Sequence, residues 1–368
     1  MGETCMNAIR RFIDRRLGRG EAAITVPILD GPLMPNAALD EAGRFAQVPD
    51  ADNLVATDQG LVCSAGAEVR RLDWVEGVAT TLLDLPAPVS AMAGGKGMLA
   101  IGVDGQGVVI HGGQFDGHRF DGMAGVGPKH PTSLAFLDGT TLLATEGSED
   151  NAAGNWRRDL MEKRRSGSLW RLDLASGKAA RILGGLGWAS GVAMTGSQRI
   201  WIAESWRHRI LSVDLETGQS TPVLEHLPAY PARIAPAVNA GYWLSFYSVR
   251  NQLVEFILRE DAYRGRMLAE VPEAYWMAPS LSSGNSFREP MQGSQLKQMG
   301  VLKPYAATRS YGLVVQCDPK MRAIRSFHSR ADGAAHGCVS VCERGDALYV
   351  ASRGAGRILR LDDVAREE

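Results

Sequence analysis

The feature that most constrains this chain is a short apolar strand motif that recurs six times along its 368 residues. The copies end in small residues or glutamate and read LVCSA (61–65), MLAIG (98–102), LLATE (142–146), IWIAE (200–204), YWLSF (242–246) and LYVAS (348–352). Self-similarity of this kind is typical of a repeat architecture, in which each unit needs its neighbours to bury its faces.

The residues around each copy predict a four-stranded unit. A further strand follows each copy: EVRRLD (68–73), VVIHG (108–112), SLWRLDL (168–174), RILSVDL (209–215), QLVEFIL (252–258) and RILRLDD (357–363). Another strand and a polar turn precede each copy, and ATTLLD and STPVLE continue two of the units into a fourth strand. Six such units predict an all-β, six-bladed β-propeller of four-stranded antiparallel blades. A β-sandwich is the main alternative, which the six-fold copy number disfavours.

The chain ends soon after RILRLDD, so the last blade lacks an outer strand. We expect a segment within 22–48 to supply that strand and to close the ring. The remainder predicts a basic amphipathic helix over 1–20, followed by a single propeller domain over 21–368. Polar, helical residues 151–165 and a long stretch at 259–310, after blade five, are expected to be lid insertions over one face.

The composition argues against nucleic-acid binding, a membrane-spanning helix and export. A net charge of −1 provides no electrostatic footprint for nucleic acid, and no apolar stretch approaches the ~20 residues of a membrane-spanning helix. The five cysteines form no Cys-x-x-Cys motif, and the N-terminus lacks the unbroken apolar run of a secretory signal. We therefore predict a reduced, cytoplasmic protein with a small-molecule ligand and without a transmembrane segment.

The repeat also predicts where a site would lie. First strands of a propeller line its central channel, and each starts beside the end of a second strand. Aligning the copies places side chains of both kinds around one channel mouth: Asp52, Thr132, Ser190, Ala232 and Cys338 from first strands, and Ser64, Glu146, Glu204 and Ser352 from second strands.

Two segments carry a family resemblance. WASGVAMTGSQRIWIAESWRHRILSVDL and LPAYPARIAPAVNAGYWLSFYSVRN resemble the strictosidine synthase-like family, which belongs to a group of six-bladed propellers with SMP-30/gluconolactonase and the paraoxonases. The resemblance covers about residues 48–363. It implies a calcium ion in the channel and hydrolysis of lactones or esters, whereas plant strictosidine synthases condense an aldehyde with an amine through a channel glutamate.

The chain departs from the family's pattern at the expected ligands. Ser190 stands where relatives carry a ligand asparagine, and Ala232 where they carry a ligand aspartate. Calcium requires several oxygen ligands, usually including carboxylates, so the expected cage is depleted. Asp52 and Glu204 remain as candidate metal ligands. No acid stands near Cys338, where the condensing glutamate is expected.

Four side chains are candidates for acid–base chemistry. Glu146 and Glu204 end equivalent strands and could act as a carboxylate pair; the alternative is local pairing, for Glu204 with Arg207 or Arg209. His130 and His336 directly precede first strands and are candidate general bases; the alternative is a hydrogen-bonded turn histidine.

The predicted ligand-binding residues are polar or aromatic, and they comprise Thr132, Ser190, Arg233, Cys338, Trp276 and Tyr311. Arg233 would favour a carboxylate- or phosphate-bearing ligand, or would pair with a neighbouring acid. Cys338 could supply a thiolate nucleophile or simply pack as a small apolar residue. Together these residues favour a hydrolase of a small lactone or ester. The alternatives are a non-catalytic small-molecule binder, a carbon–nitrogen condensing enzyme and a protein-interaction platform.

Overall fold

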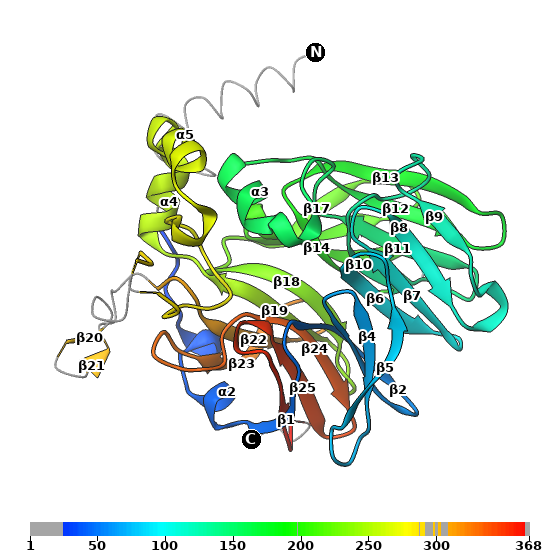
Figure 1. Ribbon diagram of the computed structural model, residues 1–368, viewed down its shortest axis with the longest axis horizontal. Helices are drawn as coiled ribbons and strands as arrows, with labels where there is room; N and C mark the ends of the chain where they lie inside the picture. The colour runs from blue at the N-terminus through cyan, green and yellow to red at the C-terminus, as the bar shows by residue number, and fades with distance from the viewer. Residues whose placement is uncertain are drawn as a thin grey trace.

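The computed structural model of the chain describes residues 25–196, 198–286, 288–290, 297–298, 301–302 and 308–364. Six four-stranded antiparallel sheets surround a common axis as the blades of a propeller (Figure 1). This confirms the predicted fold class. The predicted helix over 1–20 lies outside the described residues.

Each blade runs outward from an axial first strand. Blade 1 comprises β2 (Ala51–Thr57), β3 (Gly60–Ala65), β4 (Glu68–Leu72) and β5 (Ala79–Asp84); blade 2 comprises β6 (Val89–Gly95), β7 (Met98–Val103), β8 (Gly107–His111) and β9 (Arg119–Asp121). Blade 3 comprises β10 (Pro131–Phe136), β11 (Thr141–Glu146), β12 (Gly167–Asp173) and β13 (Lys178–Leu186); blade 4 comprises β14 (Ala189–Met194), β15 (Arg199–Glu204), β16 (Arg209–Asp214) and β17 (Ser220–Leu224).

Blades 5 and 6 differ from this simple chain order. Blade 5 comprises β18 (Ala229–Pro236), β19 (Tyr242–Val249), β22 (Gly312–Cys317) and β23 (Ala323–Ser329). Blade 6 comprises β24 (Cys338–Arg344), β25 (Ala347–Ser352), β26 (Arg357–Leu361) and, as its outer strand, β1 (Gly43–Gln47). β1 pairs antiparallel with β26, with Gly43 opposite Arg360. The prediction that residues within 22–48 close the ring is confirmed.

One predicted strand is wrong. QLVEFIL at 252–258 forms helix α4 (Gln252–Arg259) rather than the third strand of blade 5, which is β22. The side chain of Asn251 accepts a hydrogen bond from the Val254 amide at 2.9 Å and caps the helix. Val254 and Ile257, three residues apart, face the core. The insertion therefore lies inside blade 5, between its second and third strands, and not after the blade.

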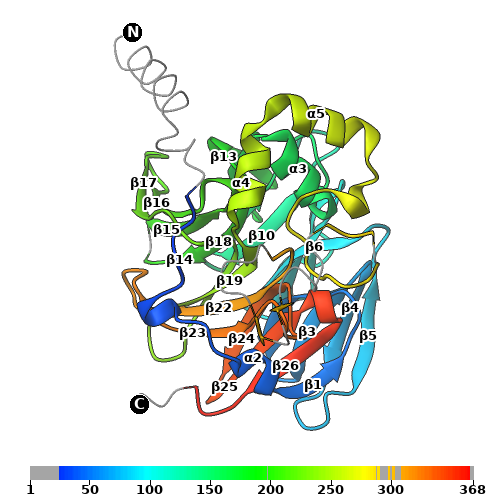
Figure 2. The same cartoon turned by 90° about the vertical axis from the view of Figure 1, so that its left-hand side faces the viewer.

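The helices of the two insertions gather on one side of the ring (Figure 2). They are α3 (Trp156–Glu162) from the blade 3 insertion, and α4 and α5 (Asp261–Glu270) from the blade 5 insertion, which also contains the two-stranded sheet of β20 (Lys297–Gln298) and β21 (Val301–Leu302). Both insertions join a second strand to a third, so they emerge beside the starts of the first strands. The predicted helical character of 151–165 is confirmed by α3.

Short elements complete the chain outside the blades. These are helix α2 (Ala38–Glu41) and the 3-10 helices η2 (Gly31–Leu33), η3 (Gly113–Phe115), η4 (Ala153–Asn155), η5 (Ser205–Arg207), η6 (Glu273–Tyr275) and η7 (Arg353–Ala355). No helix within the described ranges is long and apolar enough to cross a membrane.

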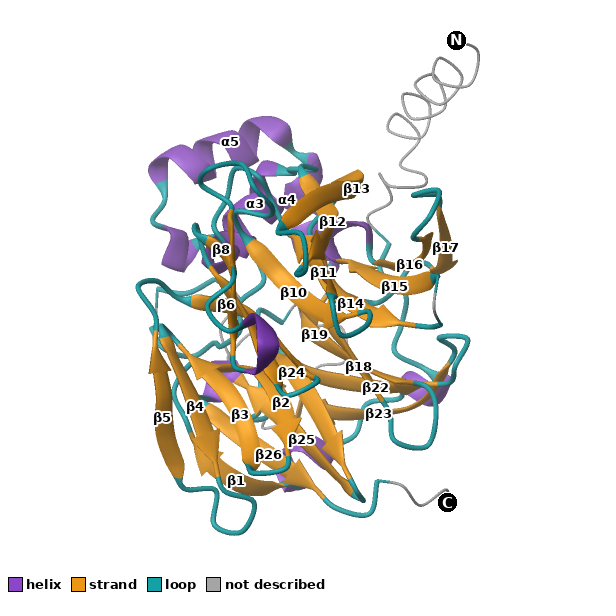
Figure 3. Cartoon of the chain, turned by 90° about the vertical axis from the view of Figure 1, so that its right-hand side faces the viewer, coloured by secondary structure: helices purple, strands orange, loops and turns teal. Residues whose placement is uncertain are grey.

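The aspartates that recur in the repeat end third strands and build the turns that follow. Asp173 accepts hydrogen bonds from the amides of Ala175 and Ser176, and Asp214 from those of Glu216 and Thr217. Such side-chain-to-backbone bonds stabilise tight turns. Figure 3 shows the sheets of neighbouring blades side by side. The core includes apolar side chains from adjacent blades, and one buried cluster contains both Ala91 of blade 2 and Leu142 of blade 3.

Candidate functional site

All six first strands share one irregularity near the axis. The antiparallel register shifts between Asp52 and Val55, Val89 and Ala91, Pro131 and Ser133, Ala189 and Gly191, Pro231 and Ile234, and Cys338 and Ser340. A β-bulge leaves its extra residue out of the ladder and frees backbone groups for other partners. The bulges therefore leave backbone groups of the first strands free to bond with neighbouring blades.

Thr132 and Ser190 use these positions to join neighbouring blades. Thr132 Oγ1 donates to the carbonyl of Ala189 in the next blade. Ser190 Oγ lies 2.9 and 2.8 Å from the carbonyl oxygens of Pro231 and Ala232, one blade further. Both hydroxyls are buried. The structure thus places the two predicted ligand-binding hydroxyls at inter-blade hydrogen bonds.

Arg233 of blade 5 and Asp52 of blade 1 form an ion pair. Arg233 Nη1 lies 2.8 Å from Asp52 Oδ1, and the two side chains are 14% and 9% exposed. Arg353, at the start of η7, approaches the other oxygen of Asp52 at 3.5 Å. The predicted pairing of Arg233 with a neighbouring acid is therefore present, and that acid is the predicted metal ligand itself.

These residues do not fit a calcium cage. Among the residues that the structure describes, no group of three or more histidines, cysteines, aspartates or glutamates is placed to hold a metal ion. The Asp52 carboxylate is occupied by a guanidinium, and Ser190 directs its proton at backbone carbonyls. Calcium binding requires converging oxygens that are not already committed.

Glu204 sits at the end of β15 with both carboxylate oxygens engaged. Its Oε1 accepts from the Gly187 amide and from Arg207, each at 2.7 Å, and its Oε2 accepts from Arg209 at 2.6 Å. The side chain is fully buried. This is the local pairing that the sequence offered as the alternative to a catalytic or metal-binding role.

Glu146 holds the equivalent place at the end of β11. Its Oε1 accepts from the amides of Lys129 and His130 at 2.7 and 3.1 Å, and its Oε2 from Ser168 and Trp170 at 3.0 and 3.3 Å. The carboxylate is therefore saturated by its own blade. Glu146 and Glu204 stabilise equivalent strand ends and do not form a carboxylate pair with one another.

His130 is held by an acid of blade 2, and Cys338 is buried. His130 Nδ1 lies 2.7 Å from Asp104 Oδ1, and that carboxylate also accepts from the Ala153 amide of the blade 3 insertion. Burial raises the pKa of the Cys338 thiol to about 12, which removes the thiolate required of a nucleophile at neutral pH. Cys338 therefore packs as a small apolar residue.

An aromatic cluster covers the channel mouth. Trp156 of α3 stacks on Tyr247 at 4.9 Å between ring centroids, and Trp206 stacks on Trp188 at 5.5 Å. Trp276 belongs to the same buried cluster and donates to the Val271 carbonyl within its own insertion. The predicted ligand residue Tyr311 lies elsewhere, in the core of blade 5, where its hydroxyl contacts His328. Trp156 and Trp276 of the two insertions thus pack in one buried cluster with rings of blades 4 and 5.

His336 takes part in a chain of polar groups at the same face. Its Nδ1 lies 2.7 Å from Ser310 Oγ, its Nε2 lies 2.8 Å from the Arg330 carbonyl oxygen, and Ser310 Oγ lies 2.7 Å from Ser283 Oγ. A carbonyl only accepts, so Nε2 carries the proton and Nδ1 of the neutral ring accepts from Ser310. Ser283 then donates to Ser310. The hydrogen bonds run in one direction, from Ser283 to His336.

The pKa of His336 is lowered overall. Burial lowers the pKa of the imidazole, while the Arg330 carbonyl and the carboxylates of Asp40 and Asp332 oppose that shift. The ring is therefore neutral at pH 7, and two nearby acids would stabilise the imidazolium formed when it accepts a proton.

Hydrogen bonds to the Glu289 side chain hold the turn that carries Ser283. Glu289 accepts hydrogen bonds from the amides of Gly284 and Asn285 at 3.0 Å each. The same carboxylate forms a buried ion pair with Arg309 at 3.1 Å, one residue before Ser310. Ser283 remains partly exposed, whereas Ser310 is fully buried. Sequence reasoning found His336 but missed both serines, because only the folded insertion brings them to it.

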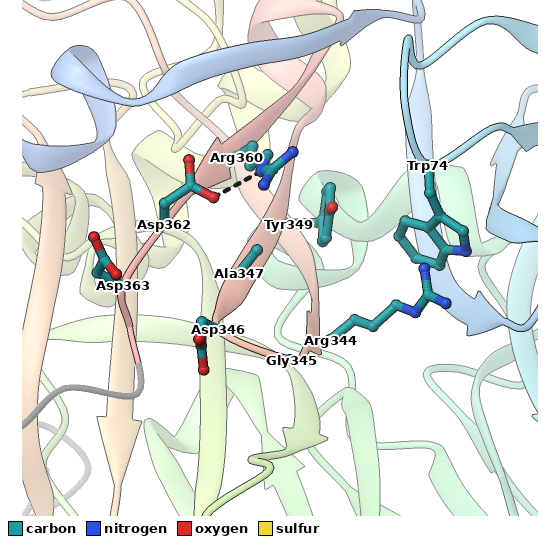
Figure 4. Close-up of a pocket in the computed structure, with 9 residues that line it drawn as sticks. All are labelled: Trp74, Arg344, Gly345, Asp346, Ala347, Tyr349, Arg360, Asp362 and Asp363. Carbon is teal, nitrogen blue, oxygen red and sulfur yellow. Dashed lines mark hydrogen bonds and ion pairs between the residues drawn. The ribbon is translucent and has the colours of Figure 1, made fainter.

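A groove of about 390 Å³ lies on the opposite face, between blades 6 and 1 (Figure 4). The Arg344 guanidinium lies 4.0 Å from the centre of the Trp74 ring, and Arg360 pairs with Asp362 at 2.8 Å. None of the predicted site residues lines it. Its cations are already satisfied by neighbours, so we give it no role.

Comparisons with known proteins show the fold alone. No known family profile and no curated protein matches the chain. Solved structures that resemble it include a luciferin-regenerating enzyme (TM-score 0.51, 14% identity, 88% of this chain and 94% of that one), a calcium-binding regucalcin from Agrobacterium tumefaciens (0.52, 11%, 87% and 92%) and a proposed gluconolactonase (0.54, 10%, 87% and 91%). The chain is thus a six-bladed propeller of the SMP-30/gluconolactonase-like fold.

Proposed function

We propose that this protein hydrolyses a small ester or lactone at the face covered by the insertions, with Ser283 as the nucleophile. The observation that carries the proposal is the directed hydrogen-bond chain from Ser283 through Ser310 to His336. Nucleophilic serines are activated in this manner, by a base that is itself oriented by a third group. Here the Arg330 carbonyl orients the base.

The reaction has two steps, acylation of Ser283 and hydrolysis of the acyl-serine. Ser283 Oγ attacks the substrate carbonyl carbon while its proton passes to Ser310, whose own proton passes to His336 Nδ1. The ester carbon–oxygen bond breaks, and the leaving alkoxide takes the proton back; in a lactone the alkoxide stays attached. Water then attacks the acyl-serine with His336 as base, which releases the acid and restores the hydroxyl.

The fold, the sequence resemblance and a partly exposed arginine also support this function. The SMP-30/gluconolactonase-like fold and the sequence resemblance to the strictosidine synthase-like family both favour lactone or ester hydrolysis over carbon–nitrogen condensation, for which no acid stands near Cys338. Arg353 is 34% exposed at this face and supports an anionic substituent on the substrate.

We place the protein in the cytoplasm, in keeping with the free thiols of Cys63, Cys317 and Cys338, which are buried.

The test is turnover of a panel of aryl esters and lactones by three variants. Ser283→Ala and His336→Gln are expected to lower kcat/KM by about 100-fold or more. Ser282→Ala is the matched control and should keep most of the activity, because the Ser282 hydroxyl accepts a hydrogen bond from the Asn285 side-chain amide at 3.1 Å and takes no part in the chain to His336. A fluorophosphonate probe should label Ser283, as read by mass spectrometry of the intact and digested protein.

Three outcomes would contradict the proposal. Full activity in Ser283→Ala would remove the nucleophile. Loss of activity in chelator, with recovery on adding calcium, would replace this mechanism by a metal-dependent one. Saturable binding of a ligand without turnover by the wild type would favour the non-catalytic binder, an alternative consistent with the saturated carboxylates of Glu146 and Glu204.

A further inference from the structure

The Arg233 guanidinium lies where oxygens of several blades converge. Arg233 belongs to blade 5, and its Nη1 contacts Asp52 Oδ1 of blade 1 at 2.8 Å and the Val339 carbonyl of blade 6 at 3.3 Å. Its Nη2 donates to the Ser90 carbonyl of blade 2 at 2.8 Å. One side chain therefore links four of the six blades.

These oxygens are of the kind that a hard cation binds. Carboxylate and backbone carbonyl oxygens are the usual ligands of calcium in proteins. Ser90 and Val339 lie at the bulges of β6 and β24, where the register shift turns backbone groups out of the ladder. The bulges thus supply the converging carbonyls, and Asp52 supplies the negative charge.

A second observation lies beside Asp52. Asn53 is 2% exposed and adopts a left-handed φ of 53°. Its amide nitrogen donates to Ser64 Oγ at 2.8 Å, while its Oδ1 is buried without a hydrogen-bond partner among the described residues. An uncommitted amide oxygen next to a carboxylate is a further potential cation ligand, and leaving it unpaired is costly.

We infer that Arg233 is the built-in cation of this propeller: its guanidinium takes the axial position that the family resemblance assigns to calcium. Arginine keeps its charge at any physiological pH, so the Asp52 carboxylate is neutralised without a bound ion. The blades around the axis consequently need no bound metal ion to be held together. The depleted positions Ser190 and Ala232 are no loss to such a site, because the guanidinium takes its oxygens from blades 1, 2 and 6.

The inference predicts an exchange of one cation for another. In Arg233→Ala, the buried Asp52 carboxylate loses its closer cationic partner and keeps only Arg353 at 3.5 Å, so the melting temperature should fall on the order of 10 °C. Millimolar calcium should then raise the melting temperature of this variant by a few degrees, since a ligand that binds only the folded state stabilises it. The wild type should show the same melting temperature in calcium and in chelator.

Terbium luminescence provides a readout that is independent of stability and of catalysis. Arg233→Ala should bind one Tb³⁺, whose emission is sensitised by aromatic rings at the channel mouth. The double variant Asp52→Asn/Arg233→Ala is the matched control and should not bind, and neither should Arg233→Lys, which keeps the positive charge. Arg353→Ala, which removes the more exposed partner of Asp52, should melt much closer to the wild type.

Three results would overturn the inference. The first is Asp52-dependent binding of Tb³⁺ or calcium by the wild type. The second is an Arg233→Ala protein that folds but gains no binding. The third is an Arg233→Ala protein that stays unfolded with and without calcium, since the oxygens would then not accept a metal ion in place of the guanidinium.

Discussion

His328 lies buried in blade 5, with Nδ1 3.1 Å from the Tyr311 hydroxyl and Nε2 2.7 Å from Ser326 Oγ. Burial lowers the pKa of this histidine from 6.5 to about 4, because its charged form is poorly solvated there. At the scale of single residues, burial is thus the main cause of altered chemistry, as it is for the Cys338 thiol and the His336 imidazole.

The lowered pKa of His328 predicts that the protein becomes less stable as the pH falls. The unfolded state takes up a proton near pH 6.5 and the folded state only near pH 4, so stability is complete above pH 6.5 and falls between these values. We expect about 3 kcal/mol of the free energy of unfolding to be lost through this group by pH 4.

The measurement is urea unfolding at pH 7 and pH 4.5. His328→Gln should show a shallower loss of stability between the two pH values than the wild type, because its side chain does not titrate. The exposed His118→Gln serves as control and should keep the wild-type slope. Equal slopes in all three proteins would show that His328 does not take up a proton on unfolding.

At the scale of elements, the sequence predicted the helical blade 3 insertion correctly but misplaced the start of the blade 5 insertion. The apolar spacing of QLVEFIL fits a helix once Asn251 caps it, yet its position after YWLSF imitates the third strand of the other units. The true strand, β22, lies some fifty residues later in the chain. Repeat alignment fails at this point because a helical insertion starts directly where a strand is due.

Trp156 is the residue by which the blade 3 insertion is joined to the channel mouth. It is 7% exposed and stacks on Tyr247, which itself accepts a hydrogen bond from Trp188 at 3.2 Å. Trp156→Ala should lower the free energy of unfolding by about 3 kcal/mol, the usual cost of removing a buried large aromatic side chain.

Urea unfolding and limited proteolysis would test this. The alanine variant should be cleaved first within residues 147–166, while Trp156→Phe, which keeps a stacked ring, should resist cleavage nearly as well as the wild type. Unchanged stability and cleavage in Trp156→Ala would mean that α3 does not rely on this contact to cover the axis.

At the scale of the whole molecule, ring closure depends on residues far apart in sequence. β1 pairs with β26, and the preceding segment is anchored on blade 5 by Leu39, which is fully buried, and by Asp40, which accepts from Ser329 at 2.7 Å. Without β1, β26 becomes an exposed strand edge, which favours pairing with other chains.

We therefore expect a chain that begins at residue 49 to self-associate on size-exclusion chromatography and to unfold without a sharp transition. A synthetic peptide of residues 36–48 should restore a monomeric, cooperatively unfolding protein. The same peptide with Leu39→Asp is the control and should fail. A truncated chain that stays monomeric without the peptide would show that closure by β1 is dispensable.

The sequence alone determined the architecture, because six copies of one strand pattern can bury their faces only by packing on one another around an axis. It also predicted Asp52, Arg233 and His336 as residues of the channel face, since their place in the repeat sets their place in the blade. Tertiary structure decided their partners. The approach of Arg233 to Asp52 spans 181 residues, and the serines beside His336 come from an insertion outside the repeat. Contacts between elements that share no periodicity leave no local pattern in a sequence, so only the folded chain could reveal them.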